Sequence, residues 1–417
     1  MMTDADDAPW LTVLGWGESG TAGLTPASRE ALEAAEVVFG ARRHLRLLPT
    51  LSAEVREWPV PFADGVPRLL AERGRRVVML VSGDPFWFGA GATLARHLAP
   101  HEWRALPSPS TFSLAASRLG WSLEGVTCLG LHARPLTRLR PHLHRGRRLL
   151  VLLRDGAAVT ELAGWLTRVG FDASRLHVLE ALGGIEERVR SVRADAELPD
   201  DIAHPVAVGL EVDGDGPALP LTPGRPDDWF DHDGQITRQA VRAVTLAALA
   251  PAPGERLWDI GTGSGSVAIE WLLAHPDNRA LGVERDAERA DRARRNAREL
   301  GVDRLEVIEG DAAILLEEQA LEEGAMARGG LRETPPDAVF IGGGLSEALL
   351  AALWHRLPAG TRLVANAVTL ESEALLAHWQ RRAGGELVRL ELAAATPIGT
   401  RRGWKAAYPI VQWRVSR

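Results

Sequence analysis

One stretch constrains the fold more than any other part of the chain, the run LWDIGTGSGSVAIE at residues 257–270. Its apolar start predicts a strand, Gly261, Gly263 and Gly265 predict a tight turn, and the residues from Ser266 predict a helix. Glycine lets the backbone turn sharply and approach a ligand closely, while the first turn of a helix offers free N–H groups. This order of elements predicts an α/β domain that binds a polar ligand on the turn.

The residues around the turn distinguish two nucleotide-type cofactors. A dinucleotide fingerprint favours a glycine or alanine at position 266, for helix packing beneath a pyrophosphate, but the chain has Ser266. Asp259 precedes the first glycine, and Glu284 ends the next predicted strand, where an acidic side chain can hold ribose hydroxyls. The pattern resembles motif I of the class I S-adenosylmethionine (SAM) methyltransferases, which favours SAM over NAD. That resemblance implies cofactor contacts at Asp259, Gly261, Thr262, Gly263, Gly265 and Glu284.

Length and charge limit the classes of protein that fit. With 417 residues the chain exceeds one ordinary domain, so two or three domains are expected. A formal net charge of -7 argues against a dedicated nucleic-acid binder. Cys128 is the single cysteine, which excludes an internal disulfide and a thiolate metal cluster, and we expect no metal site.

The chain carries no sequence signal for a membrane or for export. The start of the sequence, MMTDADD, is acidic and lacks the basic and apolar regions of a signal peptide. No run of about eighteen apolar residues is present, so we expect no transmembrane span. A cytoplasmic location is therefore expected.

The amino-terminal half also alternates predicted strands with predicted helices. The apolar runs at 10–14 and 76–81 lead into turns that contain Gly15, Gly17 and Gly83. Such alternation predicts an α/β layer with a largely parallel sheet, in which ligands bind at the carboxyl ends of the strands.

The order of these segments resembles the class III methyltransferases, the tetrapyrrole methylase family. The resemblance is carried by the glycine turn at 15–17, by Gly83-Asp84-Pro85, and by PSPSTF at 107–112 followed by a helix. The runs GARRHL at 40–45 and LHAR at 131–134 resemble in particular the branch that acts at C5 of a cobalamin precursor. In two places the chain departs from the family pattern, with Glu18 where a proline is usual and Ser108-Pro109 where Pro-Gly is usual.

This resemblance implies two α/β lobes, about 1–107 and 108–212, with SAM in the cleft between them. The implied cofactor-binding residues are Gly15, Gly17, Gly83, Asp84, Ser110 and Thr111. A polyanionic tetrapyrrole also needs local cations on an acidic protein. The candidates for substrate binding are Arg42, Arg43, His44, His132 and Arg134.

A stretch rich in glycine and proline separates the two halves. Residues 213–226 read DGDGPALPLTPGRP, which predicts a linker between a domain at 1–212 and a domain at 227–417. In the second half, QITR at 235–238 and GGG at 342–344 resemble the decarboxylating precorrin methylases, with Arg238 where that family usually has lysine. The resemblance and the need for cations add further candidates: Thr237, Asp311 and Ala312 for the cofactor, and Arg238, Gly342, Gly343, Gly344, Arg401 and Arg402 for the substrate. Asp231, His232 and Asp233 are candidates for a general acid by location alone.

Together the resemblances imply a class III tetrapyrrole methylase fused to a Rossmann-like class I methyltransferase. The implied activity is SAM-dependent C-methylation of a precorrin at C5 and C15, with loss of CO2 from the C12 acetate and one SAM site in each half. The expected partner is a small tetrapyrrole, without nucleic acid or membrane, and a homo-oligomer is expected through the carboxyl-terminal half. Three alternatives stay open: a methyltransferase fusion acting on RNA or protein, an NAD oxidoreductase, and a non-catalytic SAM-binding protein.

Overall fold

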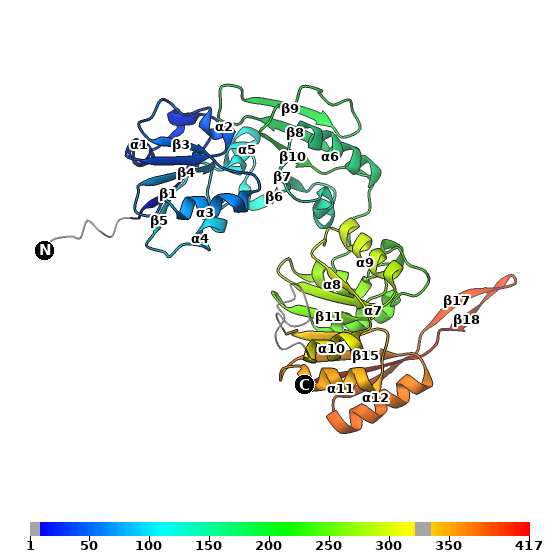
Figure 1. Ribbon diagram of the computed structural model, residues 1–417. Coiled ribbons are helices and arrows are strands. Elements are labelled where there is room, and N and C mark those ends of the chain that lie inside the picture. Colours follow the sequence, from blue (N-terminus) through cyan, green and yellow to red (C-terminus); the bar gives the residue numbers. More distant parts are fainter. Residues whose placement is uncertain (1–8, 322–334) are drawn as a thin grey trace. The chain divides into compact units, whose positions relative to one another are not determined.

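The computed structural model describes residues 9–321 and 335–417, which form two compact units (Figure 1). The first unit contains the described residues up to Leu136 together with His142–Pro217, and the second contains Thr137–Pro141 and Ala218–Arg417. The acidic amino-terminal residues, from which the sequence predicted the absence of a signal peptide, lie outside the described part. None of the described helices has the length and apolarity needed to cross a bilayer.

The first lobe of the first unit is a five-stranded sheet in the order β3-β2-β4-β1-β5, with every pair parallel. Its elements are β1 (Leu11–Trp16), α1 (Pro26–Glu33), β2 (Val37–Gly40), α2 (Arg42–Leu45), β3 (Glu54–Glu57), α3 (Gly65–Leu70), β4 (Val77–Ser82), α4 (Gly91–Ala95) and β5 (Trp103–Leu106). Successive side chains of a strand point to opposite faces. Accordingly Val13 packs on the face with Leu69 of α3, while Leu14 packs on the face with Leu32 of α1.

The second lobe has a mixed sheet in the order β6-β7-β10-β8-β9. Only β6 and β7 are parallel in it, and the other neighbours are antiparallel. Its elements are α5 (Thr111–Leu119), β6 (Thr127–Gly130), β7 (Arg148–Leu152), α6 (Gly156–Arg168), β8 (Arg175–Glu180), β9 (Arg188–Arg193) and β10 (Val206–Glu211). Helix α5 buries Phe112 and Ala115 against the strand residues Leu150 and Leu179, which fixes the start of this helix beside the sheet.

The second unit is built on a seven-stranded sheet in the order β13-β12-β11-β14-β15-β19-β16. Neighbouring strands in the run β13-β12-β11-β14-β15 are parallel. Strand β19 runs antiparallel to both of its neighbours, β15 and β16. The strands are β11 (Arg256–Ile260), β12 (Arg279–Glu284), β13 (Glu306–Glu309), β14 (Ala338–Ile341), β15 (Arg362–Ala367), β16 (Glu386–Leu390) and β19 (Ile410–Ser416). A separate hairpin of β17 (Ala393–Ile398) and β18 (Arg401–Ala406) extends away from this sheet in Figure 1.

Helices cover both faces of the seven-stranded sheet. They are α7 (Gln239–Leu249), α8 (Ser266–Ala274), α9 (Ala287–Glu299), α10 (Ala312–Leu321), α11 (Glu347–Arg356) and α12 (Leu370–Ala383). Leu257 packs with side chains of α7, α8 and α9, whereas Trp258 packs with side chains of α10, α11 and α12. The strands are therefore buried on both sides, as in other parallel α/β sheets. The predicted α/β fold class is confirmed in both units, but the largely parallel sheet predicted for the amino-terminal half occurs only in its first lobe.

Candidate cofactor and substrate sites

The glycine turn of the second unit lies at the point where the strand order changes direction. Strand β11 has β12 on one side and β14 on the other, and the chain turns at Gly261 directly after it. Open α/β sheets bind ligands at such points. Gly261 has a φ of 69°, and a Cβ on it would lie 2.8 Å from the backbone of Gly343. Gly263 has a φ of 55° and open space where a Cβ would be, so this part of the turn leaves room for a ligand.

Asp259 is buried beneath this turn. Its Oδ2 accepts hydrogen bonds from the Thr262 hydroxyl at 2.7 Å and from the Ala268 N–H at 3.1 Å. Its Oδ1 is buried and accepts no hydrogen bond from the residues described. Burial, with a smaller contribution from the nearby charge of Glu284, raises the pKa of Asp259 to about 7, although the two hydrogen bonds oppose this shift. A buried acceptor without a donor is a place where a bound ligand gains free energy.

Glu284 ends β12 on the wall of the same cavity. Its two carboxylate oxygens accept hydrogen bonds from the Gly263 N–H at 2.9 Å and the Asp286 N–H at 3.1 Å. The carboxylate is thus held at the carboxyl edge of the sheet by the backbone on both sides. An ionised carboxylate has about four acceptor positions, so two remain for a ligand.

The cavity above the turn has a volume of about 450 Å³. Most of the residues predicted for this half line it: Thr237, Arg238, Asp259, Gly261, Thr262, Gly263, Glu284, Asp311, Ala312, Gly342, Gly343 and Gly344. The Asp311 carboxylate also accepts the Ala313 N–H at 2.9 Å. Sequence reasoning missed Arg285, Arg289 and Asn366, which also line the cavity. Arg285 follows Glu284 directly and was predictable from position, whereas Asn366 reaches the cavity only because β15 pairs with β14.

The other predicted residues of this half lie elsewhere. Gly265 is the N-cap of α8, with a φ of 79°, and does not line the cavity. Arg401 and Arg402 are exposed on the β17–β18 hairpin and do not line it either. The reason is that β17 and β18 form a hairpin separate from the main sheet, which sequence periodicity does not reveal.

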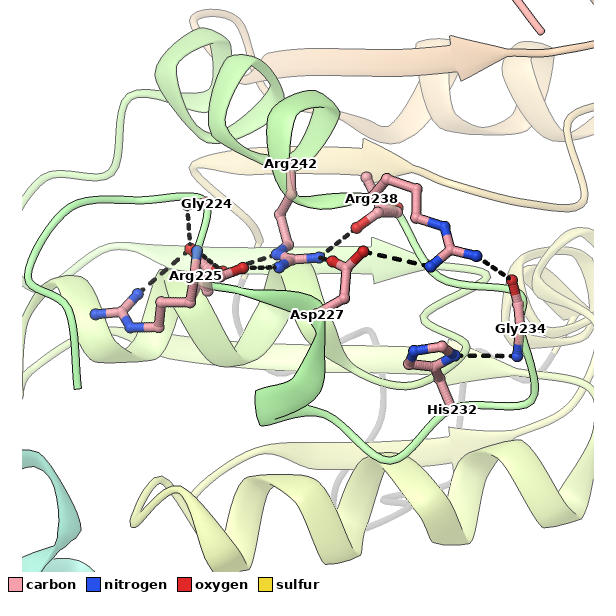
Figure 2. A network of polar contacts seen from close by, with 9 residues as sticks. Gly224, Arg225, Asp227, His232, Gly234, Arg238 and Arg242 are labelled. Atoms are coloured by element: carbon pink, nitrogen blue, oxygen red, sulfur yellow. Dashed lines mark hydrogen bonds and ion pairs between the residues drawn. The ribbon is translucent and has the colours of Figure 1, made fainter. Parts of the chain in front are cut away.

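The candidates for a general acid are also outside the cavity lining. Asp233 forms ion pairs with Arg289 at 2.8 Å and Arg292 at 3.3 Å. The Gln235 N–H and these arginines lower the pKa of Asp233 to about 2, so it carries no proton to donate near neutral pH. His232 accepts the Gly234 N–H at its Nδ1 (Figure 2), and Asp231 lies 3.4 Å from the Arg292 guanidinium. The suggestion that Asp233 is a general acid is therefore wrong.

The first unit has its own cavity, of about 300 Å³, whose lining comes from both lobes. It lies at the carboxyl ends of β1 and β4. The predicted residues that line it are Gly17, Arg43, Gly83, Asp84, Ser110, Thr111 and His132. Asp84 shapes the turn by accepting the Phe86 N–H at 2.8 Å, and Ser110 caps α5 by accepting the Ser113 N–H at 3.1 Å.

Gly15 does not line the cavity, but it allows close packing of the end of β1 against two neighbouring turns. A Cβ on Gly15 would lie 2.1 Å from the carbonyl oxygen of Gly83 and 2.4 Å from the Ser108 nitrogen. Only a glycine therefore lets the end of β1 meet both neighbouring turns.

The atypical Glu18 forms an ion pair with Arg43 at 2.6 Å inside this cavity. Burial lowers the pKa of Arg43, an effect that the Glu18 carboxylate opposes. Arg43 also donates to the Ser82 hydroxyl, which lies 3.3 Å from His44 Nε2. Burial and the Arg43 charge lower the pKa of His44 to about 3. His44 is consequently neutral and does not line the cavity, so its predicted role as a cation for the substrate is wrong.

Two further predicted cations, Arg42 and Arg134, are exposed and outside the cavity lining. In their place the cavity contains aromatic side chains that sequence reasoning missed. Trp87 and Phe88 line it and are 41% and 50% exposed. They contact Phe112 of α5, with ring centroids 5.6 Å apart in each case. The aromatic run at 86–88, directly after the Gly83-Asp84-Pro85 turn, was the signal that could have found them.

Comparisons with known proteins match the two halves of the chain to different families. Residues 11–196 match the family model of tetrapyrrole (corrin/porphyrin) methylases, and residues 228–417 match the model of the precorrin methyltransferase domain. A precorrin-6Y C(5,15)-methyltransferase [decarboxylating] from Sinorhizobium is 49% identical over 97% of this chain and 96% of its own length.

Two shorter relatives each match part of the chain. A probable cobalt-precorrin-6B C(15)-methyltransferase (decarboxylating) from Saccharolobus solfataricus is 31% identical over 36% of this chain and 73% of its own length. A cobalt-precorrin-7 C(5)-methyltransferase from Salmonella typhimurium is 27% identical over 45% of this chain and 95% of its own length. From the full-length relative it follows that the chain belongs to the family of decarboxylating precorrin-6Y C5,15-methyltransferases.

Proposed function

We propose that this chain methylates precorrin-6Y (precorrin-6B) at C5 and C15 with SAM and removes CO2 from the C12 acetate, giving precorrin-8X in cobalamin biosynthesis. One observation carries the proposal: a single chain of this family has two separate cavities, each at the carboxyl ends of parallel strands and each beside a glycine turn with an acidic residue. Two cavities of this kind suit two transfers from the same type of donor.

The first unit is assigned to C5 and the second to C15 with decarboxylation. Support comes from the family models, which match the two halves separately, and from shorter relatives that are each named for one of the two methylations. The motifs quoted for each half point the same way.

The residues that line the cavity of the second unit fit SAM. The open space at Gly263, the free Oδ1 of Asp259 and the two remaining acceptor positions of Glu284 match a ligand with an amino acid and a ribose. Glu284 would hold the ribose hydroxyls, and Asp311 would hold the adenine amino group. Bound there, SAM supplies an electrophilic methyl group on a sulfonium centre.

The cavity of the first unit fits the same methyl donor, although this unit has a different fold. Its residues Gly17, Gly83, Asp84, Ser110 and Thr111 surround the carboxyl ends of β1 and β4. The Asp84 turn and the capped start of α5 present backbone and hydroxyl groups to a polar ligand. We therefore infer one SAM site in each unit.

The main catalytic task of the protein is to align the substrate carbon with the methyl group. The bridge carbons C5 and C15 of a reduced tetrapyrrole are enamine-like nucleophiles, so holding them in line with the methyl donor matters more than a strong base. Loss of CO2 leaves an electron pair that the conjugated macrocycle accepts when an imine nitrogen is protonated. Arg43 and His132 in the first cavity and Arg238 in the second would bind substrate carboxylates, the arginines through two hydrogen bonds each.

We further infer that copies of the chain associate through the second unit. Its β17–β18 hairpin carries Ile398 and Trp404, which are 65% and 79% exposed. A second copy of the chain that covers these side chains would remove their apolar surface from water. Analytical ultracentrifugation of the chain and of a Trp404→Ser variant tests this inference, since a monomeric wild-type chain contradicts it.

Two variants of the full chain test the assignment of C5 methylation to the first unit and of C15 methylation with decarboxylation to the second. Asp84→Ala should leave CO2 release intact and add at most one methyl group, whereas Glu284→Ala should release no CO2. A mixture of the two variants should restore both methyl groups, because each contributes the site that the other lacks. Mass spectrometry of the product and trapping of labelled CO2 give the counts. A variant that still adds both methyl groups alone contradicts the two-site assignment.

A further inference from the structure

Residues 224–238 form an irregular segment that leads to the cavity of the second unit. Apart from the short 3-10 turn η5 (Asp227–Trp229), this segment has no regular structure, yet its last four residues line the cavity. A segment without a hydrogen-bonded ladder needs other contacts to fix its position. Segment 224–238 obtains them from three buried polar side chains on α7, α8 and α9.

Arg242 of α7 is the first of these side chains, and it is completely buried. Figure 2 shows its guanidinium among the residues of segment 224–238. It donates to the Asp227 carboxylate at 3.1 Å and to the carbonyl oxygens of Arg225 and Thr237. It also lies over the Phe230 ring, 4.7 Å from the centroid. One side chain therefore contacts both the beginning and the end of the segment.

Glu270 of α8 is the counterion, and it is buried as completely as Arg242. Its carboxylate accepts Arg242 Nε at 2.7 Å and the N–H groups of Gly224 at 2.7 Å and Arg225 at 3.0 Å. Helix α8 begins directly after the glycine turn, so this carboxylate connects segment 224–238 to the helix that follows the turn. A buried charge pair is tolerated when its remaining donors and acceptors are satisfied, as they are here.

Asn296 of α9 makes the most direct connection. Its Oδ1 accepts the Asp231 N–H at 2.9 Å, and its Nδ2 donates to the Asp231 carbonyl oxygen at 2.9 Å. The same Nδ2 donates to the carbonyl oxygen of Ser264, a residue of the glycine turn, at 2.9 Å. One buried amide thus joins the middle of segment 224–238 to the glycine turn, which also lines the cavity.

We propose that Asn296 and Arg242 are positioning residues for the reaction of the second unit, because they hold residues 235–238 in register with the glycine turn. This proposal rests on the proposed function. Neither side chain lines the cavity, so neither contacts the reacting groups. Their effect is on geometry: a displacement of about 1 Å in a wall that carries Thr237 and Arg238 can lower a rate about a hundredfold.

Two variants of Asn296 separate positioning from packing. Asn296→Ala removes all three hydrogen bonds. Asn296→Asp keeps the size of the side chain and the acceptor for the Asp231 N–H, but it places a carboxylate against two carbonyl oxygens. If side-chain volume were decisive, the aspartate variant would resemble the wild type. Positioning instead predicts that both variants lower CO2 release and C15 methylation at least tenfold.

Arg242→Lys provides the matching change on α7. It keeps a positive charge beside Glu270, but a single ammonium group does not reach the four acceptors that the guanidinium contacts. We expect the same pattern of loss as for Asn296. The control is Arg298→Ala, on the exposed face of α9 two residues from Asn296, and it should keep wild-type rates.

The experiment measures CO2 release and C15 methylation together with hydrogen exchange of the full chain. Support requires faster amide exchange in peptides covering 224–238, unchanged exchange in β14, and a tenfold or greater loss of rate. Rates within twofold of wild type overturn the proposal, and so does an equal rise of exchange throughout the second unit. If the wild-type chain neither releases CO2 nor transfers a methyl group, the proposed function fails, while the exchange pattern still decides whether Asn296 and Arg242 fix segment 224–238.

Discussion

Replacing Glu284 by alanine should weaken SAM binding to the second unit about a hundredfold and leave the first unit unaffected. Each Glu284 oxygen already accepts one backbone N–H, at 2.9 and 3.1 Å, which leaves two acceptor positions for the ribose hydroxyls. A hydrogen bond to a charged group contributes about 1.5 kcal/mol, so losing two costs about 3 kcal/mol. At about 1.4 kcal/mol per decade, the dissociation constant should rise roughly a hundredfold. The Gly263 N–H also loses its acceptor, which adds to the loss.

Isothermal titration calorimetry of the full chain with SAM measures this effect directly. The wild type should show two binding events per chain, and Glu284→Ala should show one at the same concentrations. Glu288→Gln is the matched control, because Glu288 lies on α9 nearby, is 79% exposed and pairs only with Arg292 among the contacts described. It should bind SAM as the wild type does. Two events of unchanged affinity in Glu284→Ala would refute the assignment of Glu284 as a cofactor ligand.

Three further outcomes are expected. Asp259 has a pKa of about 7 because burial and Glu284 disfavour its charged form, and a cationic ligand beside it favours that form. SAM binding to the second unit should therefore release a proton below about pH 7 and tighten as the pH rises to that value. Calorimetry in buffers of different ionisation enthalpy checks this, and Asp259→Asn should abolish the release. Trp87→Ala removes an aromatic face from the cavity of the first unit, so the KM of the tetrapyrrole for C5 methylation should rise about fivefold, from about 1 kcal/mol of lost stacking; an unchanged KM argues against contact. Glu18→Gln frees Arg43 from its 2.6 Å ion pair, so the same KM should fall, and a rise instead would show that Glu18 orients Arg43 for the substrate.

Sequence patterns alone predict the alternation of strands and helices and the edge of the sheet at which a ligand binds. Alternating apolar strands and helices predict parallel α/β sheets, and the ends of neighbouring parallel strands share one edge. Asp259, the glycine turn and Glu284 follow directly from this rule, because each lies within a few residues of a strand end.

Which other side chains reach the two cavities depends on contacts between distant elements. Gly343 meets Gly261 because β14 pairs with β11, and Trp87 reaches its cavity through contact with α5. Asp233 pairs with arginines of α9 and is ionised, while His44 is buried beside Arg43 and is neutral. The physical reason is that burial, charge and side-chain direction depend on elements far apart in the sequence, whose contacts no local pattern encodes.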